Sequence, residues 1–515
     1  MVTTDFTPLD LDDLTVDDVV AVARGDRQFV VSDAALGRVA AGRRHIEALA
    51  NADQPSYGVS TGFGALATVA IPPERRVALQ RSLTRSHAAG VGEPIETEVV
   101  RAMMLLRLHT LASGRTGVRP VVVEALERLL DSGIVPLVHE HGSLGCSGDL
   151  APLSHVAVAL QGEGRVWGAD GSVQGAREAL ADADLAPITL AEKEGLALTN
   201  GTDGMLAMLC LAIADLSDLL RVADITTAMS VEALLGTDRA FAADLIALRP
   251  HPGQAASAAN LRALLAGSPI VVSHRQDTTH LVQDAYSMRC APQVAGAARD
   301  ALAYSRLVAE RELASVIDNP VVTPDGRVES NGNFHGAPVA HALDFLAIPV
   351  ADVASISERR TDRLLDKSRN QGLPPFLAHE VGVDSGYMIA QYAAAGIVSD
   401  LKRLAVPASV DSIPSSAMQE DHVSMGWSAG RKLRRSLVGL RQVLAVELIT
   451  AARALDLRAP LPPGVGTGAA LAAVRTVVAG PGPDRIVADE IAAAEELLAS
   501  GALLAAVTAE IGPLE

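Results

Sequence analysis

The longest markedly apolar run of the chain is Met205-Leu-Ala-Met-Leu-Cys-Leu-Ala-Ile-Ala214. Asp215 and Asp218 end this run well short of the roughly 18 apolar residues that a membrane-spanning helix needs. Apolar side chains then continue at spacings of three and four up to residue 235, the period of an α-helix with a buried face. This stretch predicts a long buried helix.

The same period recurs in four later stretches, residues 293–314, 338–365, 385–405 and 427–457. Segments of this length and apolar content pack as a bundle of long helices. Beyond the bundle, the Gly-Pro-rich stretches 459–468 and 480–483 divide a final helical tail. We therefore expect residues 205–515 to form a long-helix bundle with a C-terminal helical tail.

The first part of the chain combines shorter helices with a few strands. Thr15 with Asp18 is typical of a helix start and Gly25 of a helix end, and Ser32 opens a second helix. Residues 165–173 are typical of a small hairpin. The sequence predicts a mainly α protein in which residues 1–204 form a small mixed α/β N-terminal domain.

Charge and cysteine content narrow the classes of protein. The chain has 515 residues, 43 Lys and Arg against 61 Asp and Glu, and a net charge of -18, which disfavours nucleic acid and anionic membranes as partners. Residues 1–18 hold six Asp and no basic or apolar region of a secretory signal. Cys146, Cys210 and Cys290 form no CxxC pair, which argues against disulfides and structural zinc. We expect a cytoplasmic enzyme with no metal.

The stretch with the most chemical content is Gly142-Ser143-Leu144-Gly145-Cys146-Ser147-Gly148-Asp149-Leu150-Ala151-Pro152-Leu153. Gly148 has no Cβ, so its amide nitrogen can approach the carbonyl carbon of Cys146 closely enough to close a five-membered ring. Loss of one water by the ring and of a second by Ser147 would leave an electrophilic methylidene carbon. A glycine-rich turn before a helix is the simpler interpretation of this stretch.

This stretch resembles the signature of the aromatic amino acid ammonia-lyases and aminomutases, which build a 4-methylidene-imidazol-5-one (MIO) from Ala-Ser-Gly. Cys146 replaces the usual Ala. The resemblance implies that Cys146, Ser147 and Gly148 form the MIO autocatalytically with no external cofactor. It also implies a fumarase/aspartase-like helical fold and a homotetramer whose active sites are shared between subunits.

Two further segments match motifs of this family. Tyr57-Gly-Val-Ser-Thr-Gly-Phe-Gly64 resembles the loop of its catalytic tyrosine, and a phenol that titrates near ~10 needs a neighbouring cation or dipole to act as a base. Asn200 opens the Asn-Gly-Thr motif, and the resemblance implies that it contacts the MIO and the substrate. Without the resemblance, both segments are ordinary turns.

The run from Gln283 to Cys290 resembles Val-Gln-Asp-Pro-Tyr-Ser-Leu-Arg-Cys of the family, with Ala285 in place of Pro. Gln283, Tyr286 and Arg289 recur at spacings of three, so they share a face if the run is helical and can also converge from a loop. The guanidinium fork of Arg289 suits the carboxylate of an amino acid, whereas Tyr286 is expected near the MIO. A surface salt bridge is the alternative for Arg289.

Substrate choice rests on two motifs. Ser86-His87-Ala-Ala-Gly90 and Gln419-Glu420-Asp-His422 match histidine-specific members, in which the histidine and the glutamate hold the substrate imidazole. The resemblance therefore implies elimination of ammonia from L-histidine to urocanate, with attack on the MIO by either the amine or the imidazole. Phe334, in Ser330-Asn-Gly-Asn-Phe-His-Gly336, matches a phenylalanine that packs near the substrate.

Four other interpretations of the sequence compete with the lyase prediction. A dinucleotide loop at Gly62-Phe-Gly-Ala-Leu-Ala67 is rejected because no apolar strand precedes it. A tyrosine or phenylalanine lyase or aminomutase would use the same electrophile. A serine or cysteine hydrolase would pair Ser147 or Cys146 with His155, although the GxSxG elbow is missing. A noncatalytic helical paralogue is the fourth.

Overall fold

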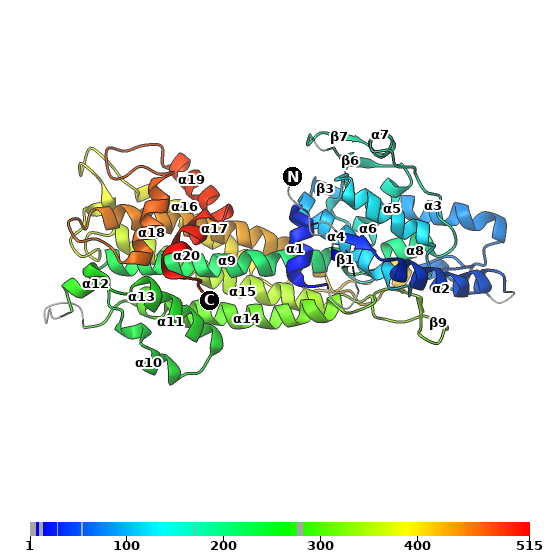
Figure 1. Ribbon diagram of the computed structural model, residues 1–515, viewed down its shortest axis with the longest axis horizontal. Helices are drawn as coiled ribbons and strands as arrows, with labels where there is room; N and C mark the ends of the chain where they lie inside the picture. Colours follow the sequence, from blue (N-terminus) through cyan, green and yellow to red (C-terminus); the bar gives the residue numbers. More distant parts are fainter. Residues whose placement is uncertain (1–6, 10–13, 28, 53–54, 169, 276–281) are drawn as a thin grey trace. The chain divides into compact units, whose positions relative to one another are not determined.

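The computed structural model describes residues 7–9, 14–27, 29–52, 55–168, 170–275 and 282–515. Helices dominate the described chain, and its strands are short (Figure 1). The predicted mainly α fold is confirmed.

The long helices follow the predicted periodic stretches closely. They are α9 (Asp203–Ala233), α14 (Ala291–Leu313), α15 (Ala337–Leu365), α16 (Met388–Leu404) and α17 (Gly426–Asp456). Residues 207–213 of α9 are fully buried, as the apolar run at the start of this helix predicts. The C-terminal tail holds α18 (Val465–Arg475), α19 (Val487–Ala499) and α20 (Ala502–Ile511).

Local capping signals set the ends of the first helices. In α1 (Val16–Arg24), Thr15 and Asp18 form a reciprocal capping box, and Gly25 ends the helix with φ +85°. In α2 (Asp33–Ala50), the Ser32 hydroxyl accepts the amide N–H of Ala35. Both predicted helix starts are confirmed.

The remaining helices are shorter. In the first half of the chain they are α3 (Arg76–His87), α4 (Thr97–Ala112), α5 (Pro120–Asp131), α6 (Leu150–Leu160), α7 (Ala176–Asp182) and α8 (Glu194–Thr199). The four that follow α9 are α10 (Ala243–Ala247), α11 (Pro252–Leu264), α12 (Pro269–Ser273) and α13 (Tyr286–Arg289).

The strands form four small sheets among the described residues. β1 (Thr7–Leu9) pairs in parallel with β2 (Phe29–Val31), and β3 (Val91–Pro94) pairs antiparallel with β5 (His139–His141). β4 (Val135–Pro136), β6 (Arg165–Trp167) and β7 (Val173–Gly175) make an antiparallel sheet that contains the predicted hairpin. β8 (Val321–Val322) and β9 (Val328–Glu329) form a two-stranded antiparallel sheet.

The chain divides into two compact units that are not continuous in sequence. Unit 1 comprises residues 1–212, 305–344 and 407–431, and unit 2 comprises residues 213–304, 345–406 and 432–515. Several long helices contribute residues to both units. The division into domains 1–204 and 205–515 stays a prediction.

One described helix has the length and composition of a membrane span. The most apolar 18 residues of α15 have a mean hydropathy of 1.6, and 61% of that window is buried within the protein. The pair α19 and α20, bent by 61°, passes the same test as one broken span. None of these helices overlaps the apolar run at residues 205–214.

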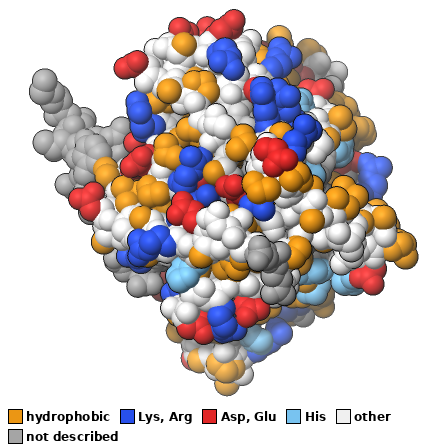
Figure 2. Space-filling model, turned by 90° about the vertical axis from the view of Figure 1, so that its right-hand side faces the viewer, with side chains coloured by type: hydrophobic (Ala, Val, Ile, Leu, Met, Phe, Trp, Pro, Cys, Tyr) orange, Lys and Arg blue, Asp and Glu red, His pale blue; other side chains and the backbone are white. Residues whose placement is uncertain are grey.

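The surface carries charges of both signs. On one face of the molecule, Lys and Arg side chains are interspersed with Asp and Glu side chains (Figure 2). Apolar side chains lie between them on that face, in several places next to one another.

Candidate active site

A cavity of about 590 Å³ in unit 1 brings together six of the predicted site residues. They come from the Tyr57 loop, α3, the loop before α6, the end of α8, the loop before α15 and the segment before α17; the residues are Tyr57, His87, Ser147, Asn200, Phe334 and Glu420. An adjoining cavity of about 460 Å³ shares Tyr57, Ser147, Phe334 and Glu420 and adds Cys146 and Gln419. These residues lie far apart in the chain, and the fold of unit 1 gathers them.

The loop that carries Ser147 has room for glycine alone at the next position. Gly148 has φ +74°, and a Cβ there would lie 2.0 Å from the carbonyl oxygen of Gly201. Asp149, which is fully buried, accepts the Ser143 hydroxyl at 2.8 Å and the Met205 amide at 2.9 Å. Burial raises the pKa of Asp149 to about 7, and these hydrogen bonds limit the rise. The loop is thereby tied to the start of α9.

Glu420 faces both side chains that precede Gly148. The Ser147 hydroxyl donates to its Oε1 at 2.8 Å, and the Cys146 thiol donates to its Oε2 at 3.1 Å. Burial, with the hydrogen bond and charge of Glu420, raises the pKa of Cys146 to about 12. The thiol therefore stays protonated at neutral pH and is a poor nucleophile.

The arrangement of these groups opposes the hydrolase alternative. The ring of His155 accepts the Gly90 amide N–H at 3.2 Å, whereas Ser147 and Cys146 both donate to Glu420. A nucleophile of this kind needs a base within hydrogen-bond reach. Among the described contacts, the group within hydrogen-bond reach of Ser147 and Cys146 is the carboxylate of Glu420, and neither residue pairs with His155.

Asn200 follows the last residue of α8 and lines the cavity. Its Nδ2 donates to the backbone carbonyl of Asn319 at 3.0 Å, which fixes the orientation of the amide because a carbonyl only accepts. Its Oδ1 is buried and has no hydrogen-bond partner among the described residues. A buried acceptor without a partner, in a residue that lines the same cavity as Ser147, suits a donor supplied by a bound molecule.

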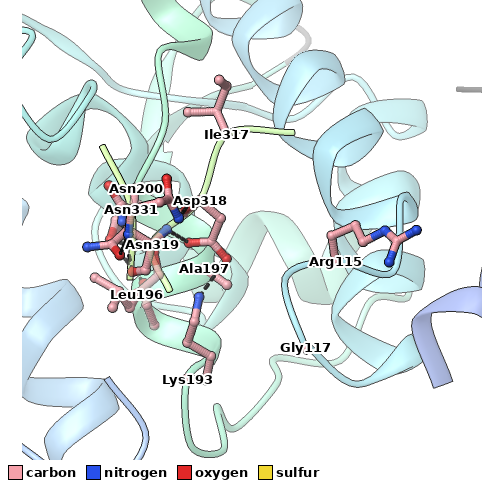
Figure 3. Close-up of polar contacts among 12 residues, drawn as sticks. Arg115, Gly117, Lys193, Leu196, Ala197, Asn200, Ile317, Asp318, Asn319 and Asn331 are labelled. Carbon is pink, nitrogen blue, oxygen red and sulfur yellow. Dashed lines mark hydrogen bonds and ion pairs between the residues drawn. The ribbon is translucent and has the colours of Figure 1, made fainter. Parts of the chain in front are cut away.

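A buried ion pair is connected to Asn200 through the backbone of Asn319. Lys193, at the N-terminus of α8, points toward Asp318, and Nζ lies 2.5 Å from Oδ2 with both side chains fully buried (Figure 3). Asp318 Oδ1 also accepts the amide of Asn319 at 2.7 Å, and Asn331 donates to the Asp318 carbonyl at 2.9 Å. The pair thus holds the peptide that orients Asn200.

Sequence reasoning missed this pair. Lys193 and Asp318 are 125 residues apart, so no local spacing connects them. One signal was available in the sequence. Lys193 shortly precedes the apolar run Gly195-Leu-Ala-Leu198, which predicts a buried position for the lysine. Because a buried lysine is rare unless it is paired, an acidic partner could have been expected.

Tyr57 lies at the cavity wall with its hydroxyl accepting the Gly64 amide at 3.3 Å. Burial raises the pKa of the phenol, the Gly64 N–H lowers it in part, and the charges of Glu420 and Asp318 raise it further. The cation that a tyrosine base requires is not among the groups that shift this pKa, so the phenol stays protonated in a single chain.

The His87 ring lies close to two polar groups. The Ser86 hydroxyl lies 3.0 Å from the Leu83 carbonyl and 3.0 Å from His87 Nδ1, and the donor in the contact with the ring depends on the tautomer. Burial lowers the pKa of His87, while the Leu83 carbonyl and the charge of Glu420 oppose the shift. A neutral ring that carries its proton on Nδ1 leaves Nε2 as an acceptor.

The three residues of the Gln283–Cys290 motif belong to unit 2. Gln283 is exposed ahead of α13, so the predicted shared helix face holds for Tyr286 and Arg289 alone. The Arg289 guanidinium lies 4.6 Å from the centre of the Tyr286 ring, which is 71% exposed. The alternative of a surface salt bridge finds no support among the described contacts of Arg289.

Another ion pair supports this motif from within unit 2. Arg360 and Glu447 are both buried, with Nε and Oε1 2.5 Å apart, and Arg360 donates to the Ser287 carbonyl at 3.1 Å. Ser287 lies between Tyr286 and Arg289, so the pair anchors the backbone of α13.

His155 provides a pH-dependent link next to the site. Burial, with the neighbouring His139, lowers the pKa of His155 to about 4, so the folded protein keeps this ring neutral where an unfolded chain protonates it below about 6.5. Its stabilising effect is therefore present above pH 6.5 and is lost as the pH falls toward 4.

For His155→Gln, which keeps an acceptor for the Gly90 amide, we expect a smaller loss of stability between pH 6.5 and 4 than in the parent protein. The difference should be about 1 to 2 kcal/mol after allowance for partial exposure of the ring. Thermal melting at several pH values measures it, and equal acid sensitivity of the two proteins would contradict the assignment.

The sequence profile of the aromatic amino acid lyases matches residues 14–476. The chain belongs to this family and is a carbon–nitrogen lyase, which confirms the predicted class. Among its relatives, the histidine ammonia-lyase of Streptomyces coelicolor is 62% identical over 502 residues, which cover 97% of this chain and 98% of that enzyme.

Solved structures agree with this placement. Tyrosine aminomutase from Streptomyces globisporus has a TM-score of 0.94 at 37% identity, over 99% of this chain and 100% of that one. Histidine ammonia-lyase from Trypanosoma cruzi has a TM-score of 0.90 at 39% identity, over 98% of this chain and 96% of that one.

Proposed function

We propose that this protein is a histidine ammonia-lyase, which eliminates ammonia from L-histidine to give urocanate. The observation that carries the proposal is the meeting of His87 and Glu420 with Ser147 in one cavity. The identity of 62% to a histidine ammonia-lyase supports the same substrate.

The polar groups of the cavity match an imidazole ring. His87 offers Nε2 as an acceptor, and Glu420 offers a carboxylate. An imidazole in its protonated form has two N–H donors, one for each acceptor, whereas a phenol has a single O–H and a phenyl ring has none. The set therefore favours histidine over tyrosine and phenylalanine.

The residues present fit an MIO formed from Cys146, Ser147 and Gly148. Gly148 lies where a Cβ would collide with Gly201, so the loop has space for a glycine nitrogen to approach the preceding carbonyl. Asn200, whose Oδ1 has no hydrogen-bond partner among the described residues, lines the same cavity. The formed group would supply an electrophilic carbon.

The remaining residues orient the substrate and move a proton. Asn200 Oδ1 accepts an N–H of the substrate amine or of the loop, and Phe334 packs against the substrate. Tyr57 removes the β-proton, for which the assembled site must lower the pKa that burial raises in the single chain. Gln419 is exposed and lines the adjoining cavity, and it binds the substrate at the outer end of the site.

The carboxylate of the substrate requires a cation, and Arg289 is the proposed clamp. We place Gln283, Tyr286 and Arg289 in the site of another subunit of a homotetramer. The exposure of Tyr286 and Val282 in one chain supports this placement. The three free cysteines suit the proposed cytoplasmic location.

A substrate panel tests the proposal. Purified protein is incubated separately with L-histidine, L-tyrosine and L-phenylalanine, and absorbance of the conjugated product and formation of β-amino acids are followed. We expect urocanate from histidine and little reaction with the others. Turnover of tyrosine without histidine would replace this proposal by the aminomutase or tyrosine lyase alternative.

Replacement of Cys146 should leave the ring-forming chemistry intact. The side chain of residue 146 lies outside the ring, and its contact is the hydrogen bond to Glu420. We expect Cys146→Ala to lose the same two water molecules as the parent and to keep kcat/KM within about 100-fold, since a hydrogen bond to a charged group contributes about 1.5 to 3 kcal/mol. An unmodified mass for this variant would contradict the prediction.

Subunit mixing tests the shared site. Ser147→Ala and Arg289→Met should each be inactive, and co-expression of the two chains should restore part of the activity. In the mixed tetramers, some sites receive Ser147 from the Arg289→Met chain and Arg289 from the Ser147→Ala chain. Co-expression of Ser147→Ala with Gly148→Ala is the matched control and should restore nothing. Equal inactivity of both mixtures would contradict the shared site.

A further inference from the structure

We propose that Glu420 has a second role, as the acid catalyst that removes the hydroxyl of Ser147 during maturation of the protein. This inference rests on the proposed function, because the dehydrated Ser147 is the electrophile that function uses. It assigns to Glu420 a reaction that precedes any encounter with substrate.

The first support is the contact itself. The Ser147 hydroxyl lies 2.8 Å from Glu420 Oε1, the separation of a strong O–H···O hydrogen bond. Among the described residues, Glu420 is the group hydrogen-bonded to this hydroxyl, whereas Tyr57, Asn200 and His87 make their described bonds to Gly64, Asn319 and Ser86. Glu420 is therefore the group placed to exchange a proton with this oxygen.

The second support is the fixed position of the carboxyl group. Oε2 accepts the Cys146 thiol at 3.1 Å and the Ser415 hydroxyl at 2.9 Å. Reciprocal backbone hydrogen bonds join Ser415 and Glu420 at 2.8 and 3.3 Å across a turn. Residues 416–418 of that turn all have positive φ, an unfavourable conformation for non-glycine residues that the closing bonds maintain.

Ring closure and dehydration then depend on different groups. Closure joins the Gly148 nitrogen to the Cys146 carbonyl carbon, and it requires the tight backbone at Gly148 rather than the side chain of Glu420. The hydroxyl of Ser147 leaves from the side chain of the middle residue, which is hydrogen-bonded to Glu420.

The elimination balances as a loss of water. The Cα–H proton of Ser147 leaves to solvent, its electron pair forms the Cα–Cβ double bond, and the Cβ–Oγ bond breaks. In the folded chain the carboxylate of Glu420 accepts the Ser147 hydroxyl, so it must first take up a proton from solvent. It then donates that proton to Oγ, which departs as water, and the carboxylate is restored. A positioned acid of this kind contributes about 10² to 10⁴ in rate.

The test measures the mass of the freshly synthesised, denatured chain for Glu420→Gln, whose amide keeps the shape and hydrogen bond but donates no acidic proton. The parent should lose two water molecules at residues 146–148. Within the time that the parent needs for complete loss, the variant should lose one, corresponding to a closed ring with an intact Ser147 hydroxyl. Loss of two waters at the parental rate, or of none, would overturn the inference.

Two matched variants make the result specific. Asp421→Asn makes the same change of charge one residue further along, at an exposed position, and should mature like the parent. Ser415→Ala removes one bond to Glu420 Oε2 and should slow the second loss of water without affecting the first. Equal effects of Glu420→Gln and Asp421→Asn would contradict the inference.

The same data separate this inference from the proposed function. A parent chain with no loss of water would refute the MIO itself, whereas normal loss in both parent and Glu420→Gln would refute the maturation role alone. A thermal melt of each variant shows that the chain has folded. Activity is not the readout, because Glu420 is also expected to bind the substrate.

Discussion

Ser147→Ala should abolish ammonia elimination, with kcat/KM lowered by at least about 10³-fold. The variant lacks the hydroxyl whose loss creates the electrophile, so its chain can lose at most the one water of ring closure. The Ser147 side chain donates to Glu420 and lines the cavity, so its replacement by Ala leaves the shape of the loop nearly unchanged. The measurement is the rate of urocanate formation together with the mass of the denatured chain.

The matched control for this variant is Ser154→Ala. Ser154 lies one helix turn into α6, is fully buried, and donates to the Leu150 carbonyl at 2.7 Å. It therefore makes the same chemical change close in sequence without touching the cavity, and it should mature and react like the parent. Retention of substantial activity by Ser147→Ala would contradict the account of the electrophile.

Lys193→Met should lower the free energy of unfolding by about 3 to 5 kcal/mol, because it leaves the carboxylate of Asp318 buried without its partner. The same change should reduce turnover by about tenfold or more, because Asp318 holds the peptide of Asn319 that orients Asn200. Thermal melting at a fixed protein concentration and the value of kcat measure the two effects.

Two comparisons make this second prediction decisive. Lys193→Met with Asp318→Asn removes both charges and should recover a large part of the stability. Arg327→Met breaks exposed pairs with Asp325 and Glu329, and it should leave the free energy of unfolding nearly unchanged. A loss for Lys193→Met as small as that for Arg327→Met would contradict the buried-pair account (Figure 3).

Local patterns accounted for much of the fold. Thr15, Asp18 and Gly25 act through contacts within a few residues, so their capping roles could be predicted from spacing alone. The long periodic stretches gave helices within a few residues of the expected bounds, because a buried stripe repeats along the helix itself. The arrangement into two discontinuous units depends on packing between distant segments and has no local signal.

The candidate active site likewise has a part that the local sequence predicts and a part that depends on contacts between distant residues. The loop of Ser147 and Gly148 could be interpreted from bond chemistry, and its family signature led to Tyr57, Asn200 and Glu420, which the fold of unit 1 gathers. The bond between Ser147 and Glu420 joins residues 273 apart, and the ion pair of Lys193 with Asp318 spans 125. Neither contact could be predicted from the sequence. The roles of Gln283, Tyr286 and Arg289 stay predictions, because these residues belong to unit 2.

The most direct measurement is the mass of the intact, denatured protein, with the modified peptide mapped by fragmentation, on the same preparation that is assayed with L-histidine. The account predicts an active preparation whose chain is lighter than its sequence by two water molecules, both missing from residues 146–148. An active preparation whose Ser147 still carries its hydroxyl would contradict it.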